Sequence, residues 1–355
     1  MLLALAVPSA QAAGGLPGSF ERVAAAGSFL HGASALHGEE LVWASQTHDG
    51  GFDILRTDLQ TQETAVLTSV VSASGGLRVQ GMAFDGRWVT WLDDRFGNVE
   101  AFALDTSSSS LRRLTSTLED EAGLTSSNGR AAWVHKGSVQ VVDLESDLRW
   151  SPANGRTDEP CLTGPFLVWS SPETNGNPAL HALDIELNVT RVMAMSGETT
   201  GHRNARCDGD LVAWERIHYD DAGTGPPTVV RMILWGDLRD GSWQNVTAVD
   251  PRRGRLLGFT AGHLAWLDVS PHGMAVYAHD VAANRTVDLG DLEMAGLSQE
   301  ALVVAREAPA GQWTLYAQRW DAEEAAPSQG IPGSLAGATA ACLLVAAGLR
   351  PRPRM

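Results

Sequence analysis

Apolar and polar residues alternate with a period of two in short runs along most of the chain, and turn residues separate the runs. The stretch 77–116 shows the unit most clearly, with apolar runs at 77–84, 87–92, 99–105 and 111–116. Asp85-Gly86, the segment DDRFGN (93–98) and the segment DTSSSS (105–110) provide turns between them. Four short antiparallel strands in this space predict one blade of a β-propeller.

Six tryptophans recur at one position of this unit, 36 to 52 residues apart. An apolar residue stands two places before each, and a mostly small residue lies between, which predicts a strand packed on both faces. The six are Trp43, Trp91, Trp133, Trp169, Trp214 and Trp266. A seventh copy has Ala305 at this position.

An aspartate ends the next strand of each of the first six repeats. The column is Asp58, Asp105, Asp143, Asp184, Asp237 and Asp280, and Arg319 takes this place in the seventh copy. We expect each carboxylate to accept hydrogen bonds from the amides of the following turn. Catalysis or metal binding is the alternative role.

The repeats predict an all-β fold, a seven-bladed propeller over residues 20–323. The seventh repeat lacks an outer strand, and the segment FERVAAA (20–26) has the right pattern and no other partner. We therefore predict that this early strand completes the last blade and closes the ring, which removes an exposed sheet edge.

The two ends are apolar. Residues 1–13 indicate a signal peptide with an A-x-A site at 10–12, although the usual basic start is missing; a disordered apolar tail is the alternative. After a polar spacer (324–330), residues 331–349 carry no charge and reach roughly 28 Å as a helix, close to the bilayer core. Arginines in the tail 350–355 predict a cytoplasmic C-terminus and an extracytoplasmic propeller.

The segments DGRWVTWLDDRFGNVEAFALD (85–105) and DGDLVAWE (208–215), with Asp237, resemble the TolB-type propeller repeats of bacterial periplasmic and archaeal cell-surface proteins. The end of the chain resembles the PGF-CTERM sorting tail of archaeal surface proteins, with Ile331-Pro332-Gly333-Ser334 in place of the motif and its Phe absent. The resemblance implies a propeller outside the cytoplasm and no particular reaction. A plain membrane anchor is the alternative for the tail.

Formal net charge is −16, from 42 acidic and 26 basic residues, which disfavours nucleic acid as a partner. Three cysteines, Cys161, Cys207 and Cys342, do not make a disulfide framework. Cys161 and Cys207 stand one column apart in neighbouring repeats. We expect Cys207 to be a core thiol, and a Cys161–Cys207 disulfide is the less favoured alternative.

Three sequons, at Asn188, Asn245 and Asn284, fall in turns between the third and fourth strands, where glycosylation is possible in an exported protein. Chance coincidence of turn Asn and strand Thr is the alternative. Polar loops after the Trp strands gather on one face of the predicted ring. The candidate ligand-binding residues there are Asp93, Asp94, Arg95, His218, Asp220 and Asp221. Ordinary turn chemistry explains them equally well.

No G-x-S-x-G, H-E-x-x-H or zinc-spaced Cys pair occurs in the sequence, and we predict no catalytic residue, metal or cofactor. The favoured function is an extracytoplasmic, membrane-tethered scaffold that binds an envelope protein, a peptide or a glycan. A secreted propeller hydrolase or lyase acting on polysaccharide is the alternative, and a purely structural envelope component is a third possibility.

Overall fold

The protein is described from a computed structural model, and all the residues that the structure describes belong to one unit, Met1–Trp320. The structure describes residues 20–26, 28–71, 77–153, 155–220, 228–246, 255–260, 262–270, 273–281, 285–308 and 312–319. The predicted signal segment 1–13, spacer 324–330, hydrophobic segment 331–349, tail 350–355 and Cys342 lie outside these ranges. Within the described ranges, no helix has the length and apolar character that crossing a membrane requires.

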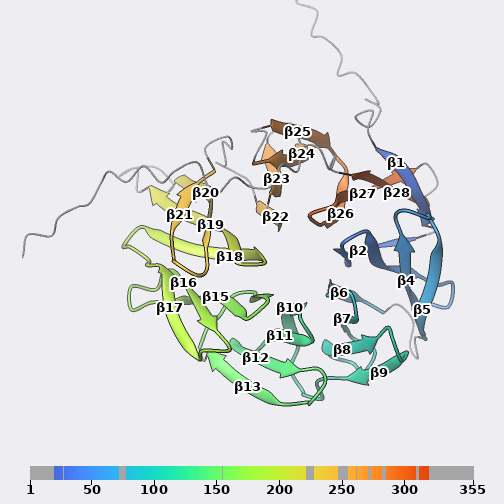
Figure 1. Ribbon diagram of the computed structural model, residues 1–355, viewed down its shortest axis with the longest axis horizontal. Coiled ribbons are helices and arrows are strands. Elements are labelled where there is room, and N and C mark those ends of the chain that lie inside the picture. Colours follow the sequence, from blue (N-terminus) through green and yellow to red (C-terminus); the bar gives the residue numbers. More distant parts are fainter. Residues whose placement is uncertain are drawn as a thin grey trace, which may run out of the picture. The chain divides into compact units, whose positions relative to one another are not determined.

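The described part of this unit forms seven four-stranded antiparallel sheets, one for each predicted repeat, placed around a centre (Figure 1). Blades 1 to 3 comprise β2 (Phe29–His37), β3 (Glu40–Gln46), β4 (Phe52–Asp58) and β5 (Thr64–Val70); β6 (Val79–Phe84), β7 (Trp88–Asp93), β8 (Glu100–Asp105) and β9 (Ser110–Arg113); and β10 (Glu121–Ser127), β11 (Arg130–His135), β12 (Ser138–Asp143) and β13 (Arg149–Ala153). The first strand of each blade is the innermost.

Blades 4 to 6 comprise β14 (Cys161–Thr163), β15 (Phe166–Pro172), β16 (Pro178–Asp184) and β17 (Val189–Ala194); β18 (Thr200–Asp208), β19 (Leu211–Asp220), β20 (Thr228–Asp237) and β21 (Trp243–Asn245); and β22 (Arg255–Phe259), β23 (His263–Ser270), β24 (Gly273–Asp280) and β25 (Arg285–Gly290). Blade 7 comprises β26 (Glu293–Leu297), β27 (Ala301–Ala308), β28 (Gln312–Arg319) and β1 (Glu21–Ala26). The inner strands contact one another in sequence, and β26 contacts β2, so the ring is closed.

The first strand of the chain completes the last blade. β1 pairs antiparallel with β28, from Glu21 opposite Ala317 to Ala26 opposite Trp313. This confirms the predicted closure by 20–26 and leaves β28 without an open edge. Arg319 reinforces the seam, because its guanidinium bonds Glu39 Oε1 at 2.8 Å and the Leu59 carbonyl, both in the blade 1 region.

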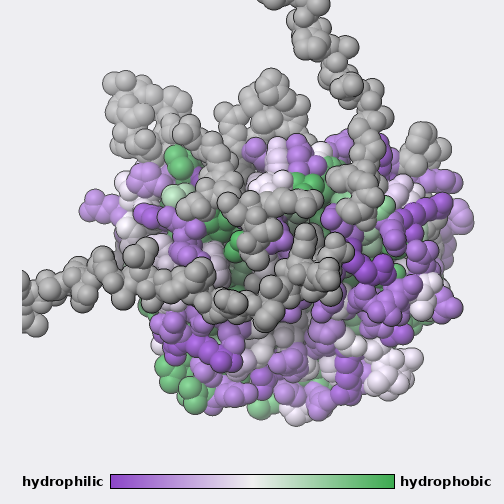
Figure 2. Space-filling model, turned by 45° about the horizontal axis from the view of Figure 1, so that its top comes forward, coloured by the Kyte–Doolittle hydropathy of each residue, from purple (hydrophilic) through white to green (hydrophobic). Residues whose placement is uncertain are grey.

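All six tryptophans of the repeat lie in the second strand of their blades and are 0 to 5% exposed. Each indole packs against the preceding blade: Trp91 against Val42 and Ile54 of blade 1, for example, and Trp43 against Val303 of blade 7. The equivalence of the tryptophan strands is therefore confirmed. Burying such side chains stabilises each blade interface by about 1.5–3 kcal/mol per large residue. On the face in Figure 2, hydrophilic residues cover most of the coloured surface.

The aspartate column has the predicted local role at five positions. Asp58, for instance, accepts hydrogen bonds from the backbone amides of Gln60 (2.8 Å) and Thr61 (2.9 Å). The same contact to a turn amide occurs at Asp105, Asp143, Asp184 and Asp237. The turn after Asp280 contains residues outside the described ranges.

The prediction that Cys207 is a free core thiol is wrong, because Cys161 and Cys207 form a disulfide with Cα atoms 5.9 Å apart. Residues at the same position of the repeat point to the same face of their blades, because side chains along a strand alternate between the two faces of the sheet. A bond between adjacent blades therefore requires residues one column apart, as these are. The disulfide joins β14 of blade 4 to β18 of blade 5.

Candidate functional site

The inner strands enclose a central channel with a cavity volume of about 1270 Å³, to which every blade contributes residues. Much of its wall is apolar, with Leu36, Phe84, Leu124, Leu162 and Phe259 among the lining side chains. Each inner strand has a sheet partner on one side only, so its other edge faces this space. The channel exceeds the roughly 300–1,000 Å³ typical of ligand pockets.

A second cavity of about 350 Å³ shares Glu159 and Arg255 with the channel wall. We call this cavity the arginine pocket; its remaining lining residues are Asp158, Arg203, Asn204, Glu215 and Arg231. Its three arginines come from three strands: β18, β20 and the first residue of β22. It thus lies beside the inner strands of blades 5 and 6.

Glu215 anchors the arginine pocket from β19, and it is 1% exposed. Its Oε1 accepts hydrogen bonds from Asn204 Nδ2 at 2.5 Å and from the Leu256 backbone N at 2.8 Å. Asn204 lies in a β-bulge of β18 between Arg203 and Arg206, with φ of +54°. Asparagine tolerates this left-handed conformation better than most residues, and the bulge leaves its amide within bonding distance of Glu215.

The three guanidinium groups keep their hydrogen-bonding capacity. Arg203 Nε is 3.8 Å and Arg231 Nη1 is 4.0 Å from Glu215 Oε2, and Arg255 Nη2 is 3.9 Å from Glu159 Oε1. These are ion pairs without hydrogen bonds, and none of the three donates one to a residue that the structure describes. Guanidinium groups present five donors in a planar fork that suits carboxylate and phosphate. The arrangement can bind an anion.

Sequence reasoning missed this pocket, although one signal was present. The residue after each of the other five repeat tryptophans is Ala, Leu, Val, Ser or Leu, whereas Glu215 follows Trp214. A carboxylate at a position that is apolar or small in the other five tryptophan repeats marks a departure from them. The positions of Arg231 and Arg255 carry no such signal.

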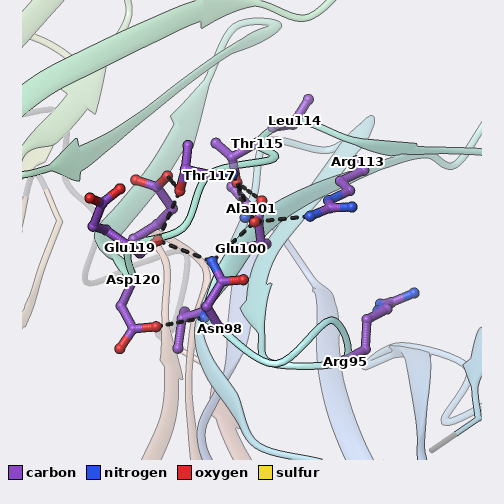
Figure 3. A network of polar contacts seen from close by, with 12 residues as sticks. Arg95, Asn98, Glu100, Ala101, Arg113, Leu114, Thr115, Thr117, Glu119 and Asp120 are labelled. Carbon is purple, nitrogen blue, oxygen red and sulfur yellow. Dashed lines mark hydrogen bonds and ion pairs between the residues drawn. The ribbon is translucent and has the colours of Figure 1, made fainter. Parts of the chain in front are cut away.

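Blade 2 holds a different polar cluster, centred on Glu100, whose side chain is fully buried (Figure 3). The carboxylate accepts hydrogen bonds from Asn98 Nδ2 (3.0 Å), Arg113 Nη2 (2.9 Å), Thr115 Oγ1 (2.6 Å) and the Thr117 backbone N (3.0 Å). Burial raises the pKa of Glu100, but these hydrogen bonds outweigh it and leave the pKa below its ordinary value. Every oxygen of this carboxylate is satisfied.

Glu121 and His135 lie beside this cluster and line a cavity of about 340 Å³ between blades 2 and 3. His135 Nδ1 is 3.0 Å from Glu121 Oε1. Burial raises the pKa of the Glu121 carboxyl, and His135 only partly opposes the shift. Trp133 also lines the cavity, and its buried Nε1 has no hydrogen-bond partner among the residues described.

The predicted ligand residues of blade 2 lie together but are occupied by one another. Asp93 is fully buried and accepts hydrogen bonds from Trp91 Nε1 at 2.7 Å and Arg95 Nε at 2.8 Å. Asp94 accepts from the backbone N and the Nε of Arg78, at 2.9 and 3.0 Å. Ligand binding by these residues stays a prediction.

The predicted ligand residues of blade 5 are only partly described. His218 Nδ1 lies 3.4 Å from the hydroxyls of both Thr199 and Thr200. Asp220 ends β19, and Asp221 lies outside the described ranges. These residues and the Asp93 group belong to different blades, and no contact between them is present in the part of the chain described.

Two of the predicted glycosylation sites lie on the surface. Asn188 is exposed in the predicted turn before β17 with φ of +52°. Asn245 is also exposed, but the predicted turn position is wrong for it, because it is the last residue of β21, the fourth strand of blade 5. Asn284 lies outside the described ranges, and modification of all three stays a prediction. Among the described residues, no group of three or more His, Cys, Asp and Glu side chains is placed to hold a metal ion.

No family model and no curated protein matches the chain. Solved structures do. The tricorn protease superposes with a TM-score of 0.57 and 13% identity over 87% of this chain, which spans only 35% of that protein. The β-propeller domain of the Trilobed protease from Pyrococcus furiosus, described as an open velcro propeller, has a TM-score of 0.57 and 10% identity, with coverage of 83% here and 94% there.

TolB from Acinetobacter baumannii is also similar, with 15% identity, a TM-score of 0.43 and 79% coverage of both chains. At these identities the likeness to the two protease propellers shows the fold and not the activity. The chain is a β-propeller of seven four-stranded blades, the architecture that the repeat resemblance predicted.

Proposed function

We propose that the protein is an extracytoplasmic, membrane-tethered scaffold that binds a partner at the channel mouth through the arginine pocket. The observation that carries the proposal is the set of three guanidinium groups without hydrogen bonds to described residues, placed where a 350 Å³ cavity meets the central channel. Blade loops and channel mouths of rigid β-scaffolds are common places for binding residues.

The disulfide supports the proposed location. Disulfides persist in oxidising compartments and are rare in the cytosol of most organisms, so the Cys161–Cys207 bond is the expected state of an exported chain. The exposed turn at Asn188 is accessible to a glycosylating enzyme in such a compartment. The tether itself rests on the uncharged sequence 331–349.

The test has two parts and uses the full chain in its own cell. Fractionation and protease treatment of intact cells measure the location; we expect membrane association, external cleavage and an oxidised Cys161–Cys207 pair. Affinity capture from envelope extract measures binding; we expect one stoichiometric partner that an unrelated protein of similar negative charge does not retain. A soluble, internal chain with reduced cysteines would contradict the location, and identical recovery on the control protein would contradict the scaffold role.

A further inference from the structure

The arginine pocket has a balanced set of charges on a protein that is acidic as a whole. Its lining has three guanidinium groups and three carboxylates (Asp158, Glu159, Glu215), so 3 − 3 leaves no net charge, and Arg206 beside it adds one positive charge. Arg206 is committed to Glu159, with its Nη2 at 3.3 Å from Oε2. Arg203, Arg231 and Arg255 therefore remain for a ligand.

Glu215 adds a second requirement. Its Oε1 is satisfied by two N–H donors, while its nearest cations lie 3.8 and 4.0 Å from Oε2. A ligand that places an acceptor between the arginines and a donor near Oε2 satisfies the whole pocket. A carboxylate attached to a chain of amide N–H groups, as in an acidic peptide, has both.

The adjoining channel wall favours a peptide over a sugar chain. Leu257 and Phe259 of β22 line this wall beside Arg255. In an extended peptide, neighbouring side chains point to opposite faces, so a carboxyl-bearing side chain and an apolar one can contact the arginines and the wall at the same time. The channel-side edge of β22 has no strand partner in its sheet, and such an edge accepts an added strand through main-chain hydrogen bonds. A sugar chain brings hydroxyls to this apolar wall and no strand-like backbone.

The net charge of −16 opposes an acidic ligand at long range, but salt screens exposed charges beyond about 8 Å at physiological ionic strength. Within that distance the carboxylates of the pocket balance its three guanidinium charges, and the unused N–H donors of the guanidinium groups decide. We propose that the arginine pocket selects an extended acidic peptide segment, with its carboxylate between Arg203, Arg231 and Arg255 and its apolar side chains against the channel wall. This inference rests on the proposed scaffold function and names the chemistry of its partner.

The test measures binding of labelled peptides to the full-length protein by fluorescence anisotropy. The probe is an extended decapeptide of alternating leucine and glutamate, and its match alternates leucine and glutamine. We expect the glutamate peptide to bind at least about tenfold more tightly, since charge-assisted bidentate hydrogen bonds are about twice as strong as neutral ones. Arg231→Gln and Arg255→Gln should each lower its affinity about tenfold, while Arg56→Gln, a similarly exposed arginine of blade 1, should change nothing.

Equal affinity for the two peptides, or unchanged binding by both pocket variants, overturns the inference. So does tight binding of a labelled polyuronate oligosaccharide with no binding of either peptide. Failure of the scaffold function itself is distinguished by the envelope capture. If the wild-type chain and both pocket variants retain the same stoichiometric partner, the scaffold role stands, but binding through the arginine pocket and the peptide assignment both fall. If the wild-type chain retains none, the scaffold role falls too.

Discussion

Blades 2 and 5 each bury a glutamate beside arginines, and they use it differently. In blade 2, four donors satisfy Glu100, and Arg113 lies 2.9 Å away. In blade 5, Oε1 of Glu215 accepts two hydrogen bonds, and Arg203 and Arg231 lie 3.8 and 4.0 Å from its Oε2. The first arrangement satisfies the carboxylate completely, whereas the second leaves guanidinium donors without hydrogen bonds to described residues.

The two blades are also held in place by different means. Blade 2 is tied to its neighbour by side chains, since Arg87 bridges Asp105 at 3.0 Å and Glu145 of the blade 3 turn. Blade 5 is tied to blade 4 by the Cys161–Cys207 disulfide. The tie between blades 4 and 5 is therefore covalent and joins inner strands, whereas the tie between blades 2 and 3 is ionic.

The largest expected effect comes from removing the covalent tie. The double variant Cys161→Ser, Cys207→Ser should lower the free energy of unfolding by about 4 kcal/mol, because the bond closes a loop of 46 residues in the unfolded chain. Urea unfolding with and without reductant measures it. Reductant should destabilise the wild-type chain by the same amount and leave the variant unchanged; equal stability of oxidised wild type and variant would remove this difference between the blades.

Next in size is the loss of the blade 2 carboxylate. Glu100→Gln should cost about 3 kcal/mol, because it leaves the Arg113 charge without its buried partner. The matched variant Glu215→Gln should cost about 1 kcal/mol, since its arginines are more distant and solvent-accessible. Thermal unfolding compares the two. Similar losses of stability for Glu100→Gln and Glu215→Gln would mean that Glu215 is as fully paired with its arginines as Glu100 is with Arg113.

Acid should lower the stability of the protein in part through His202 of blade 5. Burial, with help from Arg216, lowers the pKa of His202 to about 4, and His202 Nδ1 accepts a hydrogen bond from Trp214 Nε1. Between pH 6.5 and 4 the unfolded chain then binds more protons than the folded chain. The free energy of unfolding therefore decreases as the pH is lowered through this window, by at most about 3 kcal/mol. His202→Gln keeps an acceptor without titrating. Urea midpoints across this window should fall less steeply for the variant than for wild type; parallel curves would argue against the shift.

The smallest expected effect compares two arginines. Arg113→Gln should lower the free energy of unfolding by about 2 kcal/mol, since it abandons buried Glu100, whereas Arg231→Gln should change it by less than about 0.5 kcal/mol. Their side chains are similarly exposed, at 33% and 28%, so burial does not explain the difference. Parallel unfolding curves for the two variants would contradict the contrast between a structural and a ligand-binding arginine.

Much of the architecture was predictable from the sequence because it is set by local periodicity. The tryptophan column marks the second strand of six blades, and Asp58 and its equivalents mark the turns that follow the third. The pattern of 20–26 also predicted the strand that closes the ring. These signals repeat, so each copy strengthens the interpretation of the others.

The candidate site was not predictable in this way, since it depends on contacts between blades and on departures from the repeat. The bulge at Asn204 brings its amide to Glu215, and the arginine pocket assembles residues from β18, β19, β20 and β22. The disulfide likewise follows from which faces of blades 4 and 5 meet. The sequence by itself determined the strands, their repeat and the ring, because a period of two acts within each segment. Only the tertiary structure decided which polar groups are satisfied and which remain for a ligand, because that depends on distances between segments far apart in the chain.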